Sequence, residues 1–184
     1  MLSFATKGYD AVSLDALAGD LGVSKQTILY WFESKEALMA AVISQGAGEL
    51  SAALELALDA EAEGFARVEL VVRSVFRLAA SRPELLGLLR EVARLGPPPA
   101  AQMTQALDPL VQRAAGFLAQ EMDAGRMRRS DPKLLLLAMY STVIGMVTEV
   151  EVMRALGEQA DGRSLVRRRR DVLELLRTAL SVES

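Results

Sequence analysis

Apolar residues recur along this chain with the period of an α-helix, and no alternation of apolar and polar residues is long enough to predict a strand. Leu14, Leu17 and Leu21 illustrate the spacing, because residues three or four apart share one face of a helix. The same periodicity restarts after Gly64 and continues almost to the C-terminus. The pattern therefore predicts an all-α fold.

Start and stop signals divide this pattern into separate helices. Serine or aspartate stands at several predicted starts, and glycine or proline at most predicted ends. Pro109 predicts a kink or a break inside a long helix. The expected helices are residues 1–7, 13–21, 24–32, one that begins after Glu33-Ser34, 65–81, 83–95, one that ends near 123, 132–156 and 163–180.

Two of these helices are short and are joined by a tight turn at Gly22. This is the layout of a helix-turn-helix, whose second helix enters the major groove of DNA. Ile28 and Phe32 are four residues apart and are expected to pack inward, on Leu17 and Leu21.

The rest of the second helix is then available for DNA. Residues at the N-terminus of a recognition helix reach base edges. Lys25 suits guanine or phosphate, Gln26 suits adenine, and the Thr27 methyl suits thymine. Tyr30 and Trp31 either contact phosphate and sugar or pack partly inside the N-terminal helical domain, called the head below.

Helix N-termini also bind phosphate through their free N–H groups. Serines mark three such ends, at Ser13, Ser24 and Ser34, and Lys35 adds a positive charge beside the third. The predicted DNA-binding residues are Ser13, Ser24, Lys25, Gln26, Thr27, Tyr30, Trp31 and Lys35.

These motifs resemble a known family. The DNA-binding head of the TetR repressors is similar to residues 8–43, which read GYDAVSLDALAGDLGVSKQTILYWFESKEALMAAVI. The segment that leads into that family's penultimate helix is similar to residues 124–147, AGRMRRSDPKLLLLAMYSTVIGMV. The resemblance implies a three-helix DNA-binding domain over residues 1–46 and a helical ligand-binding and dimerisation domain over 47–184.

The resemblance also implies how such a protein works. The last two helices would form a four-helix bundle in a homodimer, the middle helices would enclose a small-molecule effector, and ligand binding would release a palindromic operator. Two departures stand out. Leu29 replaces a tyrosine that commonly contacts phosphate, and only seven residues precede Gly8, whereas the family's first helix is longer and usually follows a basic arm. Either the true N-terminus lies upstream or DNA binding is weaker.

The middle and later helices carry candidates for the effector cavity. Methionine suits adaptable pockets, although core packing is the simpler role for each of these side chains. Few charges fall on the apolar faces, which favours an apolar or weakly polar effector. The candidates are Phe76, Leu89, Met103, Leu110, Phe117, Met139, Thr142 and Met146.

Composition excludes several classes of function. The chain has no cysteine and no histidine, so disulfides, thiolate metal sites, a histidine base and a cysteine nucleophile are all excluded. Glu149 and Glu151 are two residues apart and do not face each other on a helix. We therefore expect no catalytic residue, no metal and no cofactor.

The chain shows no signal-peptide pattern, and its most apolar run, 134–147, is shorter than the roughly 18 residues needed to span a bilayer. We therefore expect a cytoplasmic protein with no membrane partner.

Charge leaves an alternative open. The net charge is −3, and the first 46 residues hold three lysines against five carboxylates, which gives −2. Because phosphate neutralisation drives DNA affinity, the chain could instead be a helical small-molecule binding protein with a weak or non-functional head. The run Arg167–Arg170 does not offset this charge, since four successive helical residues point all around the axis and predict a solvated or ion-paired helix end.

Overall fold

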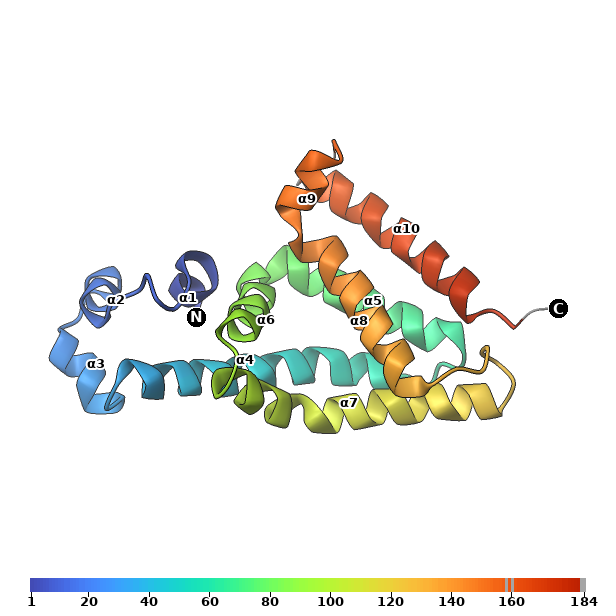
Figure 1. The fold of residues 1–184 in the computed structure, drawn as a ribbon, viewed down its shortest axis with the longest axis horizontal. Coiled ribbons are helices and arrows are strands. Elements are labelled where there is room, and N and C mark those ends of the chain that lie inside the picture. Colours follow the sequence, from blue (N-terminus) through green and yellow to red (C-terminus); the bar gives the residue numbers. More distant parts are fainter. Residues whose placement is uncertain (158, 160, 183–184) are drawn as a thin grey trace. The chain divides into compact units, whose positions relative to one another are not determined.

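The computed structural model describes residues 1–157, 159 and 161–182, and it confirms the all-α prediction, with no strand among these residues. Figure 1 labels the helices along the chain. They are α1 (Leu2–Lys7), α2 (Leu14–Leu21), α3 (Lys25–Trp31), α4 (Lys35–Leu58), α5 (Phe65–Ser81), α6 (Pro83–Leu95), α7 (Pro99–Asp123), α8 (Pro132–Thr148), α9 (Val150–Ala155) and α10 (Gly162–Leu180).

Side-chain caps explain where several of these helices begin. Ser13 accepts a hydrogen bond from the N–H of Ala16 at 3.0 Å, and so satisfies one of the free donors at the start of α2. Asp131 does the same for α8, because its carboxylate accepts the N–H groups of Lys133 and Leu134 at 2.8 and 3.0 Å. Local chemistry therefore fixes these boundaries.

The described chain divides into two compact units, residues 1–51 with 83–108 and residues 52–82 with 109–184. Helices α4 and α7 each contribute to both units. The predicted domain boundary after residue 46 falls inside α4, and it stays a prediction.

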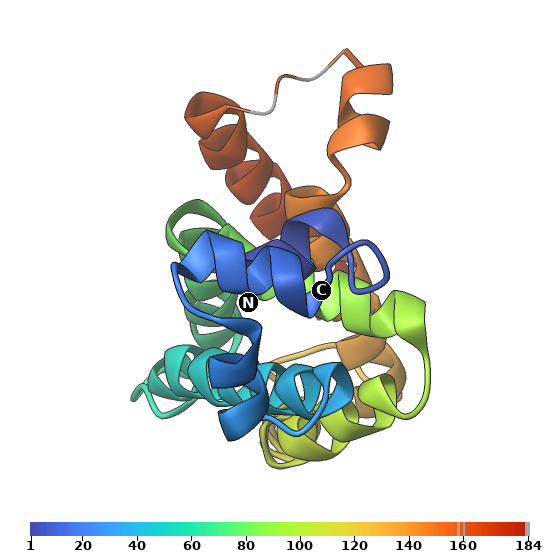
Figure 2. The same ribbon diagram turned by 90° about the vertical axis from the view of Figure 1, so that its left-hand side faces the viewer.

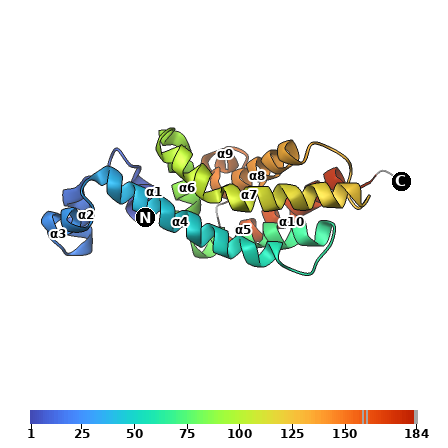
Figure 3. The ribbon, with the colours of Figure 1, turned by 90° about the horizontal axis from the view of Figure 1, so that it is seen from below.

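In the first unit, α1 lies against α6 and α2 lies against α3 (Figures 2 and 3). Phe4 and Leu88, which are 1% and 0% exposed, are core residues of this unit. Gly87 lets the first pair of helices approach, since a Cβ at this position would lie 3.1 Å from the backbone oxygen of Ala5. The small residue thus sets how closely α1 packs.

In the second unit, α5, α8 and α10 pack on one another around a single hydrophobic cluster. Its buried members include Val72, Phe76, Phe117 and Val172. The Glu121 carboxylate of α7 stabilises the loop before α5, because it accepts a hydrogen bond from the Gly64 N–H at 2.8 Å.

The prediction of one helix over 132–156 was wrong. Helix α8 ends at Thr148, and α9 begins after Glu149, whose backbone angles are φ −83° and ψ 63°. The Met146 carbonyl would bond the N–H four residues on in a continuous helix. It accepts instead a 2.6 Å hydrogen bond from the Arg168 guanidinium, so a long-range contact replaces the helical one.

The expectation for the arginine run was wrong at one position. Arg168 is 8% exposed, whereas Arg170 is exposed and pairs with Asp171 at 3.0 Å. Pro109 also does not break α7, which continues through it.

By length and composition, α4 is the one helix among the described residues that could cross a membrane. A third of its most apolar window is buried in the fold, and core helices of soluble proteins pass the same test.

Candidate nucleic-acid interface

The turn between α2 and α3 is closed by a left-handed glycine. Gly22 has φ 67° and ψ 29°, a conformation that costs other residues steric strain. The following Val23 N–H donates to the Ala18 carbonyl at 3.0 Å, and Ser24 then caps α3 by accepting the Thr27 N–H at 3.1 Å. The glycine, the cap and the short helices give the helix-turn-helix predicted from sequence.

The buried side of α3 agrees in part with the prediction. Ile28 and Leu17 are buried, and Phe32 is half-buried. Leu21 was expected to face inward as well, but it is 68% exposed. It is the last residue of α2, directly before the turn, and α3 does not cover it.

The opposite side of α3 is open to solvent. Lys25, Gln26 and Thr27 are exposed, and Tyr30 and Trp31 are 81% and 73% exposed. The two rings contact edge to face, with centroids 5.3 Å apart. Packing inside the head is therefore excluded for this aromatic pair, which is free to meet a partner.

Several of these polar groups are engaged with one another in the free protein. The Lys25 ammonium lies 2.8 Å from the Asp15 carboxylate. The hydroxyls of Ser24 and Thr27 are 2.9 Å apart. DNA contacts by these side chains would replace the existing ones.

We expect Asp15→Asn to tighten DNA binding about two- to fivefold, because it frees Lys25 and removes a negative charge from the α2–α3 face. The estimate follows from the roughly 0.2–1 kcal/mol of an exposed ion pair. Fluorescence anisotropy with labelled duplex at two salt concentrations measures the change. Asp59→Asn, at an exposed carboxylate of the second unit, is the control and should change nothing. Equal affinities for Asp15→Asn and wild type would contradict this assignment.

Lys35, at the start of α4, is held by a residue that the sequence analysis did not select. Its ammonium lies 4.1 Å from the centre of the Tyr9 ring, and the Tyr9 hydroxyl donates to Glu36 at 3.0 Å. Burial and the Glu36 carboxylate raise the pKa of Tyr9. The Glu36 pKa is lowered by its own backbone N–H, and further by Ser34 and Tyr9. No local pattern pointed to Tyr9, which follows the first helix.

The effector candidates fall in both units. Leu89 and Met103 are buried in the first. The other six belong to the second unit: Phe76 and Phe117 are in its hydrophobic cluster, Met139 and Met146 pack against it, and Leu110 and Thr142 are half-buried.

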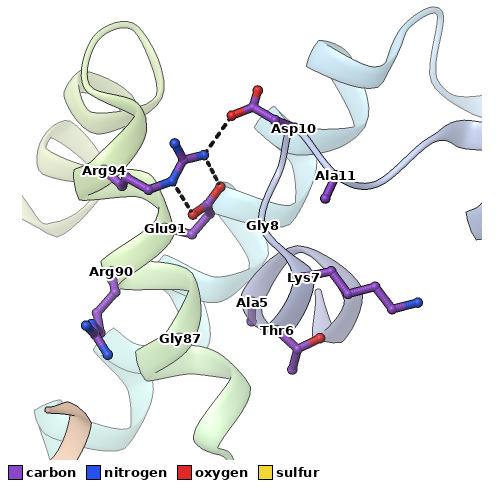
Figure 4. Close-up of a pocket in the computed structure, with 10 residues that line it drawn as sticks. All are labelled: Ala5, Thr6, Lys7, Gly8, Asp10, Ala11, Gly87, Arg90, Glu91 and Arg94. Atoms are coloured by element: carbon purple, nitrogen blue, oxygen red, sulfur yellow. Dashed lines mark hydrogen bonds and ion pairs between the residues drawn. The ribbon is translucent and has the colours of Figure 1, made fainter. Parts of the chain in front are cut away.

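A separate polar cluster joins α1 and α6 in the first unit (Figure 4). The Tyr9 N–H donates to Glu91 at 2.6 Å. Arg94 donates to both Glu91 oxygens at 2.8 Å, and to Asp10 at 2.9 Å. Hydrogen bonds from Arg94 outweigh burial and lower the pKa of Glu91. The sequence analysis did not predict this cluster. The signal for it was Glu91, a charged residue in a stretch that also contains the apolar Leu88, Leu89 and Val92.

The comparison that decides the family concerns the N-terminal segment. Residues 2–42 match the model of the bacterial regulatory proteins of the tetR family. This N-terminal segment matches the TetR family. The matched segment contains α1, α2, α3 and the start of α4, so the resemblance noted for residues 8–43 is confirmed. The chain matches no curated protein sequence.

Solved structures share the fold of this chain over almost its whole length. A Saccharomonospora viridis protein described as a transcriptional regulator, in complex with choline, is 18% identical with a TM-score of 0.80, covering 99% of this chain and 93% of that one. FadR from Bacillus subtilis, in complex with stearoyl-CoA, is 22% identical with a TM-score of 0.78, covering 96% of this chain and 92% of that one. AibR, in complex with isovaleryl coenzyme A and operator DNA, is 17% identical with a TM-score of 0.78, covering 94% of this chain and 90% of that one.

Proposed function

We propose that this TetR-family protein is a ligand-responsive repressor, a homodimer that binds a palindromic operator and releases it when a small effector binds. The observation that carries the proposal is the exposed polar and aromatic face of α3 in a capped helix-turn-helix. AibR, which has a similar fold, was solved with both operator DNA and an acyl-coenzyme A, and this supports the pairing of the two partners. The proposed compartment is the cytoplasm, where bacterial DNA lies, and the proposed activity is binding, with no catalytic step.

The proposed DNA contacts are those of the exposed face. Lys25, Gln26 and Thr27 at the N-terminus of α3 would reach base edges, and Tyr30 with Trp31 would lie against phosphate and sugar. The helix starts at Ser13 and Ser24, together with Lys35, would bind phosphate.

An apolar face of α8 supports the homodimer. Leu134, Leu137 and Tyr140 are 66%, 58% and 49% exposed, and their spacing of three residues places them along one side of the helix. Val166 and Leu175 of α10 are exposed as well. A second copy would cover such a surface.

We place the effector among the candidates of the second unit. Phe76, Phe117, Met139 and Met146 share one hydrophobic cluster, which favours a ligand with a substantial apolar part. The half-buried Thr142 offers a hydroxyl that would orient it. Choline and acyl-coenzyme A, the ligands of the similar structures, are chemically too different to select one class for this chain.

The test is DNA binding by the purified protein to its own promoter region, measured over a series of salt concentrations. A repressor that neutralises phosphates shows affinity that falls steeply with salt. Failure to bind, even with any upstream N-terminal residues restored, contradicts the proposal. A salt slope near zero supports the alternative of a small-molecule binding protein with an inactive head, for which the acidic character of the first 46 residues is the motivation.

Two substitutions should separate base reading from phosphate binding. We expect Gln26→Ala to reduce discrimination at one base pair by about 1–3 kcal/mol, because a bidentate contact to adenine is lost. Lys35→Ala should weaken binding to all sequences about equally and reduce the salt slope by about one. Competition assays with single-base variants of the operator measure both, and equal effects of the two changes would contradict the assignment.

A further inference from the structure

The connection between α1 and α2 is held by α6 through one buried carboxylate. Glu91 is 8% exposed, and both of its oxygens are engaged. One of them accepts the backbone N–H of Tyr9 at 2.6 Å. A buried charge without partners would be costly, so this one depends on the donors that surround it.

Arg94 extends this contact into the DNA-binding head. Its guanidinium donates to both oxygens of Glu91 on its own helix and to Asp10, which lies 84 positions away in the sequence. Bidentate guanidinium–carboxylate pairs have a defined geometry as well as strength. A single planar group therefore links α6 to the residues that lead directly into α2.

Packing at the turn is incomplete on the side of this contact. A hollow of about 540 Å³ lies beside the cluster, lined by small residues such as Gly8, Ala11 and Gly87 as well as by the charged groups (Figure 4). The close approach at Gly87 holds α1 itself. Glu91 and Arg94 bind the backbone N–H of Tyr9 and the Asp10 carboxylate at this turn, while Lys35 and Glu36 contact the Tyr9 side chain.

We propose that Glu91 and Arg94 are positioning residues for DNA binding, which hold the helix-turn-helix in one orientation on α6 without touching DNA. The inference rests on the proposed dimeric repressor. A dimer meets two half-sites separated by one helical turn, about 10 base pairs, so the orientation of each head selects the spacing. Without the cluster, the helix-turn-helix can rotate on α6. A dimer of such a variant would bind its native operator more weakly and would discriminate less between half-site spacings.

The second unit supplies a matched control. Glu121 is 4% exposed, accepts a backbone N–H from Gly64, and is paired with Arg126 through Nε and Nη2 at 2.5 and 2.9 Å. Arginine hydrogen bonds lower its pKa as they lower that of Glu91. Glu121→Gln and Glu91→Gln thus remove equivalent charges, only one of which contacts the head.

The experiment measures the affinity of the full-length protein for its operator and for duplexes whose half-sites are moved one or two base pairs closer or further apart. We expect Glu91→Gln to weaken operator binding about tenfold and to reduce the preference for the native spacing by a similar factor. Asp10→Asn, which removes only the bridge from Arg94, should lie between wild type and Glu91→Gln. Glu121→Gln should keep the wild-type preference for the native half-site spacing, even if its melting temperature falls as much as that of Glu91→Gln.

The outcomes separate the two proposals. A wild-type spacing preference in Glu91→Gln overturns the positioning role, and so does an equal loss of preference in Glu121→Gln, which would show a general effect of lower stability. Wild-type protein that binds no duplex overturns the repressor itself and the positioning role with it.

Discussion

Leu137→Asp should convert the protein to a monomer and abolish tight operator binding. Leu137 is 58% exposed at the centre of the apolar face that also includes Leu134 and Tyr140. In a two-fold interface each substitution occurs twice, so two carboxylates would enter the same apolar contact without partners. Burial of such charges is expensive, and the dimer dissociation constant should rise by about a thousandfold or more.

Loss of the dimer should affect operator binding strongly while the head remains intact. A monomer binds one half-site and loses the effective concentration that the second head experiences once the first is bound. We expect the affinity for the palindrome to fall at least about a hundredfold and to approach that for a single half-site. Analytical ultracentrifugation and anisotropy titrations with full and half operators measure the two effects.

Leu56→Asp is the control for this prediction. Leu56 of α4 is 80% exposed, so the same charge enters solvent rather than the proposed interface. Its dimer constant and operator affinity should match wild type. A Leu137→Asp protein that sediments as a dimer would contradict the proposed interface, and a helical circular dichroism spectrum would show that the variant is folded.

The second large effect is expected for Arg168→Met, which should lower the free energy of unfolding by about 2–4 kcal/mol. The Arg168 guanidinium donates to the Met146 and Ser164 carbonyls and contacts the Met153 sulfur. Methionine keeps the apolar stem but removes these donors, and a buried acceptor left unsatisfied costs about 1–3 kcal/mol. The positive charge also lies at the C-terminus of α8, where the helix dipole favours a cation.

Thermal unfolding tests this expectation against a residue of the same arginine run. Arg170 has a side chain that is 75% exposed, and Arg170→Met should change stability by less than about 0.5 kcal/mol. The difference corresponds to a melting temperature lower by about 4–16 °C for Arg168→Met at this chain length. Equal melting temperatures for the two variants would show that the buried position of Arg168 contributes nothing.

The sequence by itself determined the local structure of the N-terminal helices. Caps such as Ser13 and Ser24 and the left-handed Gly22 act within a few residues of the chain, so the helices of the head could be located without any tertiary information. The residue types on α3 also predicted a DNA-binding surface, and the same segment matches the family model of the bacterial regulatory proteins of the tetR family.

Only the tertiary structure decided which side chains meet across long distances in the chain. The exposure of Tyr30 and Trp31 was left open by helical periodicity, because either side of a short helix can be covered. The break after Thr148 depends on Arg168 of another helix, which takes a carbonyl that local rules assign to α8 itself. These outcomes are set by neighbours from distant segments, which helix periodicity and capping signals do not encode.

The Glu91 cluster is the clearest case of a feature that only the fold could bring together. Its partners Tyr9 and Asp10 lie 82 and 84 positions from Glu91 and Arg94, and no local spacing relates them. The sequence therefore determined which residue types α3 carries, whereas the packing of α1 on α6 brought together the groups that hold the turn before α2.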